Sequence, residues 1–380
     1  MLRNKFRIEK PNRVKHNTDF VLDNFVDVEM KKILLPLYVM QCLSLAPKYS
    51  IRYGIITSNS RKFNIFICLF VVGIATAWLP TLLNYFTEAV GMYAITVLVY
   101  GISLVITIIK NSFVTTAQSN LNASFITLIQ RIHKRFKFIK LDNKAISIVN
   151  WLFLIIVTAY NIAHLTARML ESNMAFVSKL LTHLIYMTID CNSIIIICTL
   201  YLLGKLIESW ISELRCICCA NISDIERKEH LNKLIVAYDE LIEALEVCNK
   251  LFRVPIFFAV LSTFFQVFIN VQAAIFMPVW TKIMYISQII WIKNLTLLFI
   301  LCMESENIRL QLKNAKAACT VLCARETTID VPRLLRRQGR AVGAGWLSAA
   351  GLFSVDAALP PRVLAVLATY TIVILQFYFL

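Results

Sequence analysis

The stretch RVLAVLATYTIVILQFYFL, residues 362–380, decides the fold class of this sequence. After Arg362 it contains no formally charged side chain. A helix of this length rises roughly 28 Å, which is close to the hydrocarbon thickness of a bilayer. Pro360 and Pro361 stand just before it, and because proline lacks a backbone N–H and restricts the residue before it, we expect a helix to start or kink there. The stretch is therefore predicted to cross a membrane.

The composition extends this prediction to the whole chain. Hydrophobic residues make up 58% of the sequence and the mean hydropathy is +0.67, whereas soluble domains are roughly 45–50% apolar. Long apolar runs with only nine glycines and nine prolines favour helices over a β-barrel of many turns. The net charge of +16 does not indicate a nucleic-acid partner, because the basic residues gather between the apolar runs.

Seven apolar runs are predicted to be transmembrane helices, so the fold class is an all-α, polytopic membrane protein. Six of the runs lie within residues 63–303, and the seventh is 362–380. The predicted spans are 63–86, 90–109, 148–170, 180–203, 254–280, 283–303 and 362–380. Each run is long enough to cross a bilayer as a helix.

Residues 1–62 are predicted to be a basic cytosolic region that contains one shorter apolar segment. This segment, 33–47, is too short to span comfortably. Pro36 and Pro47 are expected to limit its helix. We interpret it as an interfacial or re-entrant helix; counted as a full span, it would raise the total to eight.

The distribution of basic residues predicts the orientation. Twelve Lys and Arg residues lie in 1–62, seven in the connection after the second span and eight in the connection after the sixth. The short loops on the opposite side offer only Lys179 and Lys282. Because cytosolic loops are enriched in Lys and Arg, we expect a cytosolic N-terminus and an extracellular C-terminus. A G-protein-coupled receptor has the opposite orientation.

The last predicted helix carries a family resemblance. The residues Thr369-Tyr370, five residues, then Gln376-Phe377 resemble the TY-x5-QF signature that ends insect gustatory receptors. The lead-in at 349–356 also resembles the family's approach to its last helix. The alternative is a tail-anchoring helix with incidental polar residues.

The resemblance implies a function, an assembly and a gate. It implies a tastant-gated non-selective cation channel in the plasma membrane of chemosensory neurons, formed as a homo- or hetero-tetramer with other gustatory receptors. The seventh helices would line one pore. Val373, Gln376 and Phe377 would form its gate, while Tyr370 is expected to be buried further inward. Thr371 stands where the family's sugar receptors often carry an acidic residue, which favours a bitter or plant compound as ligand.

Two polar connections are predicted to be helical extensions in the cytosol. In 225–252 the apolar residues recur at the i, i+3, i+4, i+7 spacing of an amphipathic helix. The region 304–324 begins a second extension, within a segment 304–361 that we divide into an anchor helix and a re-entry segment. The resemblance implies that these extensions form the cytosolic anchor domain of the tetramer. The residues 249–252 before Pro255 resemble the turn by which the family enters its fifth span.

Polar and aromatic side chains in the outward halves of the third to sixth spans are the candidate ligand-binding residues. They are Tyr160, His164, His183, Tyr186, Gln266, Asn270, Gln272 and Gln288. Such a mixture suits a pocket for a small amphipathic molecule. For each residue the alternative is helix–helix packing with a satisfied hydrogen bond.

Two ionisable residues are expected deep within the membrane. Asp190 lies near the middle of the fourth span and Lys293 near the middle of the sixth. Intramembrane charges are rare and face either a partner or a water-filled cavity. The matching depth leaves two interpretations open: the two residues pair, or each faces its own aqueous pocket.

No enzyme motif, cofactor site or metal site is expected. The sequence contains no Walker loop, no G-x-S-x-G and no HExxH. The cysteines around residue 218 fit no standard zinc module. The rival functions are a sugar-responsive gustatory receptor, an odorant receptor of the same superfamily, a G-protein-coupled receptor, a secondary transporter and an intramembrane enzyme. Similar repeated halves would favour a transporter, and none is evident.

Overall fold

The computed structural model describes residues 25–52, 54–88, 91–135, 143–171, 176–219, 223–276, 282–325 and 347–379. In chain order the described elements are α2 (Val28–Leu43), β1 (Ser50–Arg52), β2 (Ile55–Thr57), α3 (Arg61–Glu88), α4 (Gly91–Ala117), α5 (Ser119–Arg135), α6 (Asn143–Glu171), α7 (Phe176–Cys219), α8 (Asp224–Phe276), α9 (Lys282–Arg325), β3 (Ser348–Ala349), β4 (Phe353–Ser354) and α11 (Leu359–Phe379). The predicted all-α fold class is confirmed, with two short antiparallel hairpins as the described strands.

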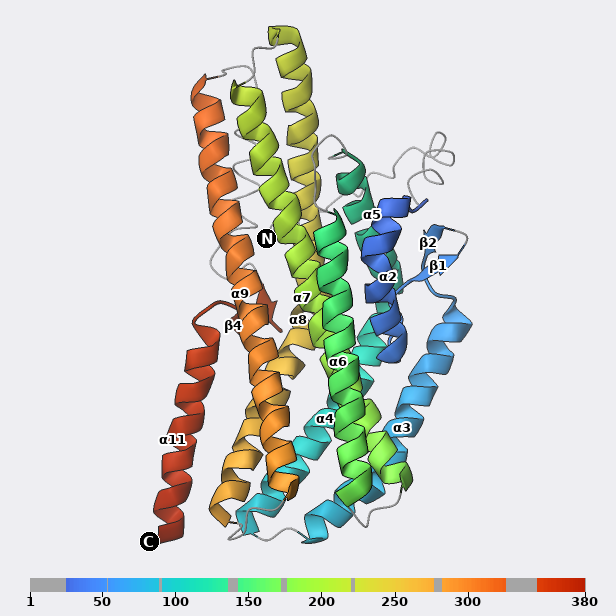
Figure 1. Cartoon of the computed structure of the whole chain (residues 1–380), viewed down its shortest axis with the longest axis vertical. Coiled ribbons are helices and arrows are strands. Elements are labelled where there is room, and N and C mark those ends of the chain that lie inside the picture. The colour runs from blue at the N-terminus through green and yellow to red at the C-terminus, as the bar shows by residue number, and fades with distance from the viewer. Residues whose placement is uncertain are drawn as a thin grey trace, which may run out of the picture.

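Seven helices in the described part of the chain are long and apolar enough to cross a membrane. They are α3, α4, α6, α7, α8, α9 and α11. Each contains all of one predicted span or, for the spans 90–109, 254–280 and 362–380, the part of it that the structure describes. They run roughly along the long axis of the molecule, and all of them except α11, which stands at the side, form one bundle (Figure 1). The chain is therefore a multi-pass membrane protein; its sidedness stays a prediction.

The first helix differs from the expectation for 33–47. It begins earlier, at Val28, and Pro36 lies inside it instead of ending it. Proline removes one helical hydrogen bond, which frees the carbonyl four residues earlier. That carbonyl, of Lys32, accepts a hydrogen bond from Ser147 Oγ of α6 at 3.1 Å. Packing against α6 and α7 therefore makes the internal proline tolerable.

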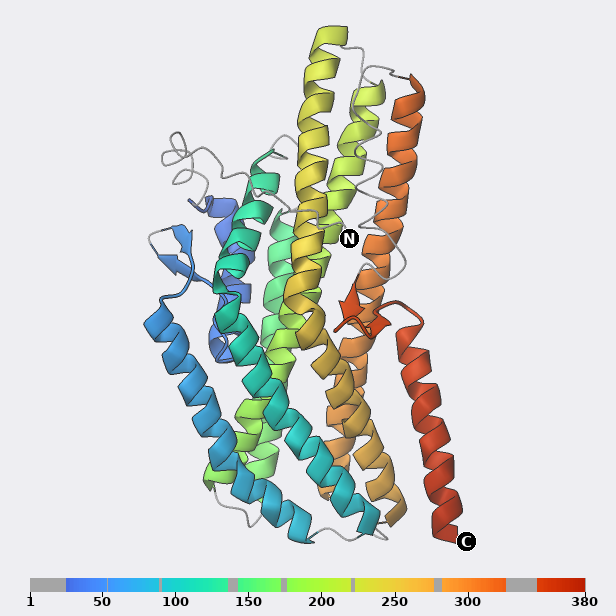
Figure 2. The ribbon, with the colours of Figure 1, turned by 180° about the vertical axis from the view of Figure 1, so that it is seen from behind.

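Three helices continue far beyond the length that a bilayer requires. Helices α7 and α9 each have 44 residues, and α8 has 53. Their ends project together beyond the rest of the molecule (Figure 2). Trp210 and Tyr238 pack with ring centroids 4.4 Å apart in this projection. The expected turn at 249–252 is absent, because α8 is continuous through Pro255.

A hairpin joins the seventh spanning helix to this long-helix bundle. Strands β3 and β4 are connected through Ala350 and Gly351, whose φ angles are 52° and 78°. Two consecutive positive φ angles characterise the type I′ turn, whose twist suits a hairpin. The Ala350 N–H donates to Arg253 O of α8 at 2.9 Å, and Ser305 Oγ of α9 donates to Val355 O at 2.6 Å. The hairpin is thus fixed to both helices.

Helix α11 starts where the double proline predicted. Pro360 and Pro361 occupy its first turn, where backbone N–H groups lack helical partners in any case. The Ala358 N–H donates to Asp356 Oδ1 at 3.1 Å just before the helix. The helix then stands at the side of the bundle (Figures 1 and 2). Only 17% of its apolar window is buried, compared with 78% for α7. Most of the predicted re-entry segment, 326–346, lies outside the described residues.

Candidate ligand-binding site

The two intramembrane charges meet. Lys293 Nζ of α9 forms an ion pair with Asp190 Oδ2 of α7, and the two side chains are 15% and 4% exposed. Asn161 Nδ2 of α6 donates to the same carboxylate oxygen at 3.4 Å. Burying a charge in hydrocarbon is costly unless it is compensated. Of the two open interpretations, the structure therefore shows the ion pair, which joins α7 to α9, while Asn161 adds α6.

An aromatic and imidazole cluster lies beside the ion pair. Lys293 Nζ is 4.7 Å from the centroid of the Tyr160 ring, a cation–π distance. The Tyr160 ring stacks on His164 with centroids 6.3 Å apart. His164 in turn lies 6.0 Å from His183 and 6.4 Å from Tyr186. The predicted residues of α6 and α7 therefore form one cluster with the ion pair.

Side chains from α4 and α8 extend this cluster into a network. The Tyr100 hydroxyl of α4 donates to Gln266 Oε1 of α8. The same phenol also interacts with Tyr186 and with Ser262. One turn beyond Gln266, Asn270 Nδ2 donates to the Gln266 backbone carbonyl at 2.7 Å. The polar network thus joins five helices: α4, α6, α7, α8 and α9.

Two predicted residues are not shown to join the network. Gln288 accepts a hydrogen bond from Trp291 Nε1 on its own helix. Gln272 is fully buried, and neither atom of its amide has a hydrogen-bond partner in the part of the chain that the structure describes.

The fold has counterparts among solved structures, although the sequence finds none: no family model and no curated protein matches the chain. The structure of the insect olfactory receptor OR5 from Machilis hrabei aligns over 92% of this chain and 99% of that chain, with a TM-score of 0.54 and 14% identity. The same receptor in complex with eugenol aligns over 92% and 97%, with a TM-score of 0.51 and 13% identity. The chain has the fold of an insect olfactory receptor. Identity this low shows the fold alone.

Within this olfactory-receptor fold, the residues of the TY-x5-QF motif lie on α11, a helix that the rest of the chain leaves mostly uncovered. Thr369 Oγ1 and Thr371 Oγ1 donate to the carbonyls of Ala365 and Leu367, four residues earlier. Tyr370 is 52% exposed, so this chain alone does not bury the phenol, and its burial in an assembly stays a prediction. Its ring packs edge-on against Phe268 of α8, with centroids 6.3 Å apart.

The gate residues of the prediction are only partly described. Val373 is 38% exposed and Gln376 is exposed as well, so neither is covered by this chain. The side chain of Phe377 lies outside the described residues. Among the described His, Cys, Asp and Glu side chains, no three come together as a metal site; those of Cys218 and Cys219 lie outside this description.

Sequence reasoning missed Tyr100 as a member of the network. Tyrosine occurs in several of the predicted transmembrane helices, so the residue type alone gave no reason to choose Tyr100 as a candidate ligand-binding residue. In the structure Tyr100, Leu104 and Ile108 follow one another at spacings of four and are all buried, but most neighbouring residues of this span are apolar as well, so the sequence does not single out this face. A helix face of this kind turns inward, so a tyrosine on it needs a polar partner from a neighbouring helix.

Proposed function

We propose that the chain is a subunit of a ligand-gated cation channel of the insect chemoreceptor superfamily. The observation that carries the proposal is the buried polar network inside an olfactory-receptor fold. Its ion pair, histidines and tyrosines converge from α4, α6, α7 and α9, and Gln266 adds a fifth helix, α8. A stable membrane bundle does not require such a set, because apolar and small residues pack spanning helices well.

The ligand in this proposal is small, amphipathic and uncharged. Asp190 and Lys293 compensate each other, so a net charge on the ligand would remain unpaired in a low-dielectric site. Tyr160, His164 and Tyr186 supply both aromatic surface and polar groups to this site. A bitter or plant secondary compound has this chemistry, and Thr371 in place of an acidic residue favours it over a sugar.

The pore in this proposal forms between four copies, either identical or mixed with related receptors. Helix α11 offers a mostly uncovered surface on which Leu364, Val366 and Ile372 are 44%, 45% and 56% exposed. Four such helices around one axis would place Val373, Gln376 and Phe377 at a common constriction. Apolar rings of this kind block ions by dewetting.

An odorant receptor is the second candidate. The likeness to an olfactory receptor over 92% of the chain favours it, whereas the TY-x5-QF motif favours a taste receptor. The two functions differ in ligand volatility and share the channel mechanism. A ligand panel that contains both volatile and non-volatile compounds separates them.

The deciding experiment records currents from outside-out patches of cells that express the chain alone or with a co-receptor. The solutions contain neither ATP nor GTP, and the panel holds alkaloids, plant glycosides, sugars and volatile phenols. We expect a cation current that opens on ligand addition and closes on removal. A response in intact cells that disappears in nucleotide-free patches would identify a G-protein-coupled receptor instead. A Tyr160→Leu variant, matched for surface expression, should shift the half-activating concentration.

A further inference from the structure

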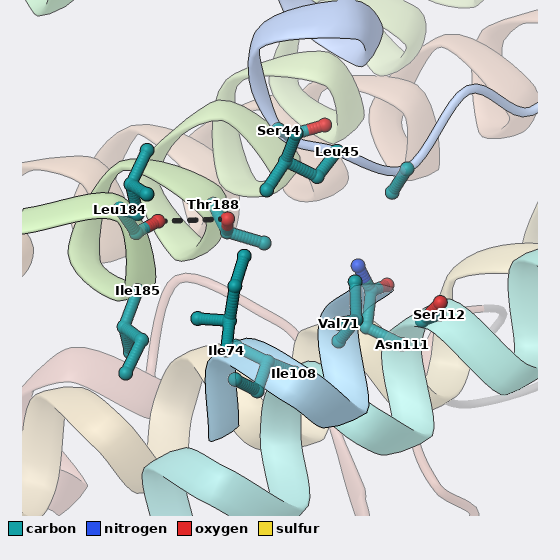
Figure 3. Close-up of a pocket in the computed structure, with 11 residues that line it drawn as sticks. Ser44, Leu45, Val71, Ile74, Ile108, Asn111, Ser112, Leu184, Ile185 and Thr188 are labelled. Carbon is teal, nitrogen blue, oxygen red and sulfur yellow. Dashed lines mark hydrogen bonds between the residues drawn. The ribbon is translucent and has the colours of Figure 1, made fainter. Parts of the chain in front are cut away.

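Three small cavities follow one another around the middle of α7. The first lies between the turn at 44–46, α3, α4 and α7 (Figure 3). The second lies between α4, α7 and α8, and the third between α7, α8 and α9. The first and second share Ile108, Asn111 and Thr188 in their walls, and the second and third share Ile189, Ser193 and Ala259. Because of these shared walls, each cavity directly neighbours the next in the series.

The size of the cavities suits water better than an organic ligand. Their volumes are about 10, 20 and 20 Å³. A water molecule needs roughly 10–15 Å³ of space for its centre, together with two to four polar partners. Ligand pockets are usually a few hundred Å³ or more. Each cavity therefore has room for one or two waters.

Asn111 supplies polar atoms that need a partner there. Its side chain is 6% exposed, and neither amide atom has a hydrogen-bond partner among the described residues. Its side chain lines the first two cavities, and it lies across from the turn at Ser44 and Leu45 in the first (Figure 3). An amide offers both donors and an acceptor. Water can serve both, whereas a buried amide left unpaired carries the full cost of its desolvation.

Polar side chains of α7 add further partners along the series. Thr188 Oγ1 donates to Leu184 O at 2.8 Å, which leaves its lone pairs available (Figure 3). Asn192 Nδ2 donates to Thr188 O at 2.8 Å, while its Oδ1 has no partner in the described chain. The third cavity is lined by Asp190 itself. Water there would hydrate the ion pair and lower the cost of its burial.

We propose that ordered water molecules occupy the three cavities and connect Asn111 to the Asp190–Lys293 ion pair. The middle of α7 is then held to α4 and α8 through water. Such bridges are nearly as favourable as direct hydrogen bonds. This proposal concerns the interior of one chain and does not depend on the proposed function.

The test uses the full-length protein in lipid nanodiscs and two independent measurements. High-resolution cryo-electron microscopy should show density peaks within hydrogen-bonding distance of Asn111, Asn192 and Asp190. Radiolytic labelling in isotopic water should modify Phe258, which lines the second cavity, faster than Phe257, which is half-buried as well but lines none of the three.

Two isosteric substitutions on α7 provide the matched comparison. Thr188→Val removes a hydroxyl from the walls of the first two cavities. Thr199→Val removes an equally buried hydroxyl with the same bond to the carbonyl four residues earlier, but outside the cavities. We expect Thr188→Val and Asn111→Leu to lose the density and the fast labelling, and Thr199→Val to keep both. Labelling of Phe258 at the rate of Phe257, with empty density at Asn111 in the unmodified protein, would overturn the proposal. So would equal effects of the two valine variants.

Discussion

Buried charged side chains are stabilised in two different ways in this bundle. Asp190 and Lys293 neutralise each other within the membrane. Lys48, which follows the first helix, is 6% exposed and its amine lies 4.6 Å from the centroid of the Phe252 ring. Burial lowers the pKa of the Lys48 amine to about 8, while the nearby Cys248 acts in the opposite direction. The first charge is compensated by a partner and the second by an aromatic face and partial neutralisation.

The ion pair predicts that two substitutions together are milder than either alone. Asp190→Asn leaves Lys293 uncompensated, and Lys293→Met leaves Asp190 uncompensated. Breaking a buried pair from one side costs roughly 3–5 kcal/mol, whereas replacing both partners is often nearly neutral. We expect each single variant to lose melting temperature and surface expression, and the double variant to recover most of both. Strictly additive losses would show that the two residues act independently.

The Lys48 amine predicts a specific pH dependence of stability. Its pKa falls from an ordinary value near 10.5 to about 8 on folding. Between these values the unfolded chain binds more protons, so folding becomes more favourable as pH rises through this window. Below pH 8 the amine is charged in both states, and its burial lowers the free energy of unfolding by the full amount, about 3 kcal/mol.

Lys48→Met should therefore raise the melting temperature at pH 7, and its advantage over the unmodified protein should shrink towards pH 10. Lys62→Met, at an exposed position of α3, is the control and should change little. An advantage that is constant with pH would contradict the assigned cause.

At the scale of elements, the hairpin β3–β4 determines how α11 leaves the long helices. Its bond to α8 is made by Ala350, which has a positive φ in the turn, and its bond to α9 is made by Val355, four residues after Gly351. Glycine accepts this conformation without cost, whereas other residues lose roughly 1–2 kcal/mol there. Gly351 is therefore the position at which a small change should loosen the attachment of α11.

Gly351→Ala and Gly73→Ala form a matched pair for this idea. A Cβ atom added at either glycine meets no atom within 4 Å, but only Gly351 has a positive φ, of 78°. We expect Gly351→Ala to lower the melting temperature. Gly73→Ala, inside α3, should leave it unchanged or raise it, because alanine is roughly 1 kcal/mol more favourable than glycine in a helix. Equal effects would show that the turn geometry does not limit stability.

Helix α11 itself predicts two separable changes in current. Phe377→Ala should widen an apolar ring and raise the basal current without ligand. Gln376→Ala should remove a polar lining and change the permeability ratios between cations. Whole-cell currents with ion substitution, normalised to surface protein, measure both. Unchanged basal current, gating and selectivity in both variants would place the pore elsewhere.

At the scale of the whole molecule, the sequence could predict the spans because span length and hydropathy are properties of one segment. Whether two side chains come into contact depends on two helices at once, because it requires the rotation of each helix about its own axis to be known. The depth of Asp190 and Lys293 allowed a pair without requiring one, and Tyr100 could not be matched to Gln266 without knowing how α4 faces α8. Gln288 was predicted to face a ligand, but its hydrogen-bond partner Trp291 lies only three residues away on the same helix. The internal Pro36 became understandable only when Ser147 of α6 was seen beside it.

The orientation in the membrane remains a prediction with a direct test. The basic residues of 1–62 predict a cytosolic N-terminus and an extracellular C-terminus. Epitope tags at the two ends, stained before and after permeabilisation, should be visible on intact cells only at the C-terminus. A visible N-terminal tag, or a glycan on Asn122 or Asn221, would reverse the scheme and favour a G-protein-coupled receptor.

The sparse attachment of α11 has a consequence for how stability must be measured. If neighbouring copies cover this helix, then folding and association are linked, and the apparent melting temperature depends on the amount of protein per lipid. Dilution into excess lipid would lower it without any change in sequence or solvent. Unfolding would also lose its two-state form, since α11 would separate before α7, whose window is 78% buried within its own chain. Variants should therefore be compared at one fixed protein-to-lipid ratio.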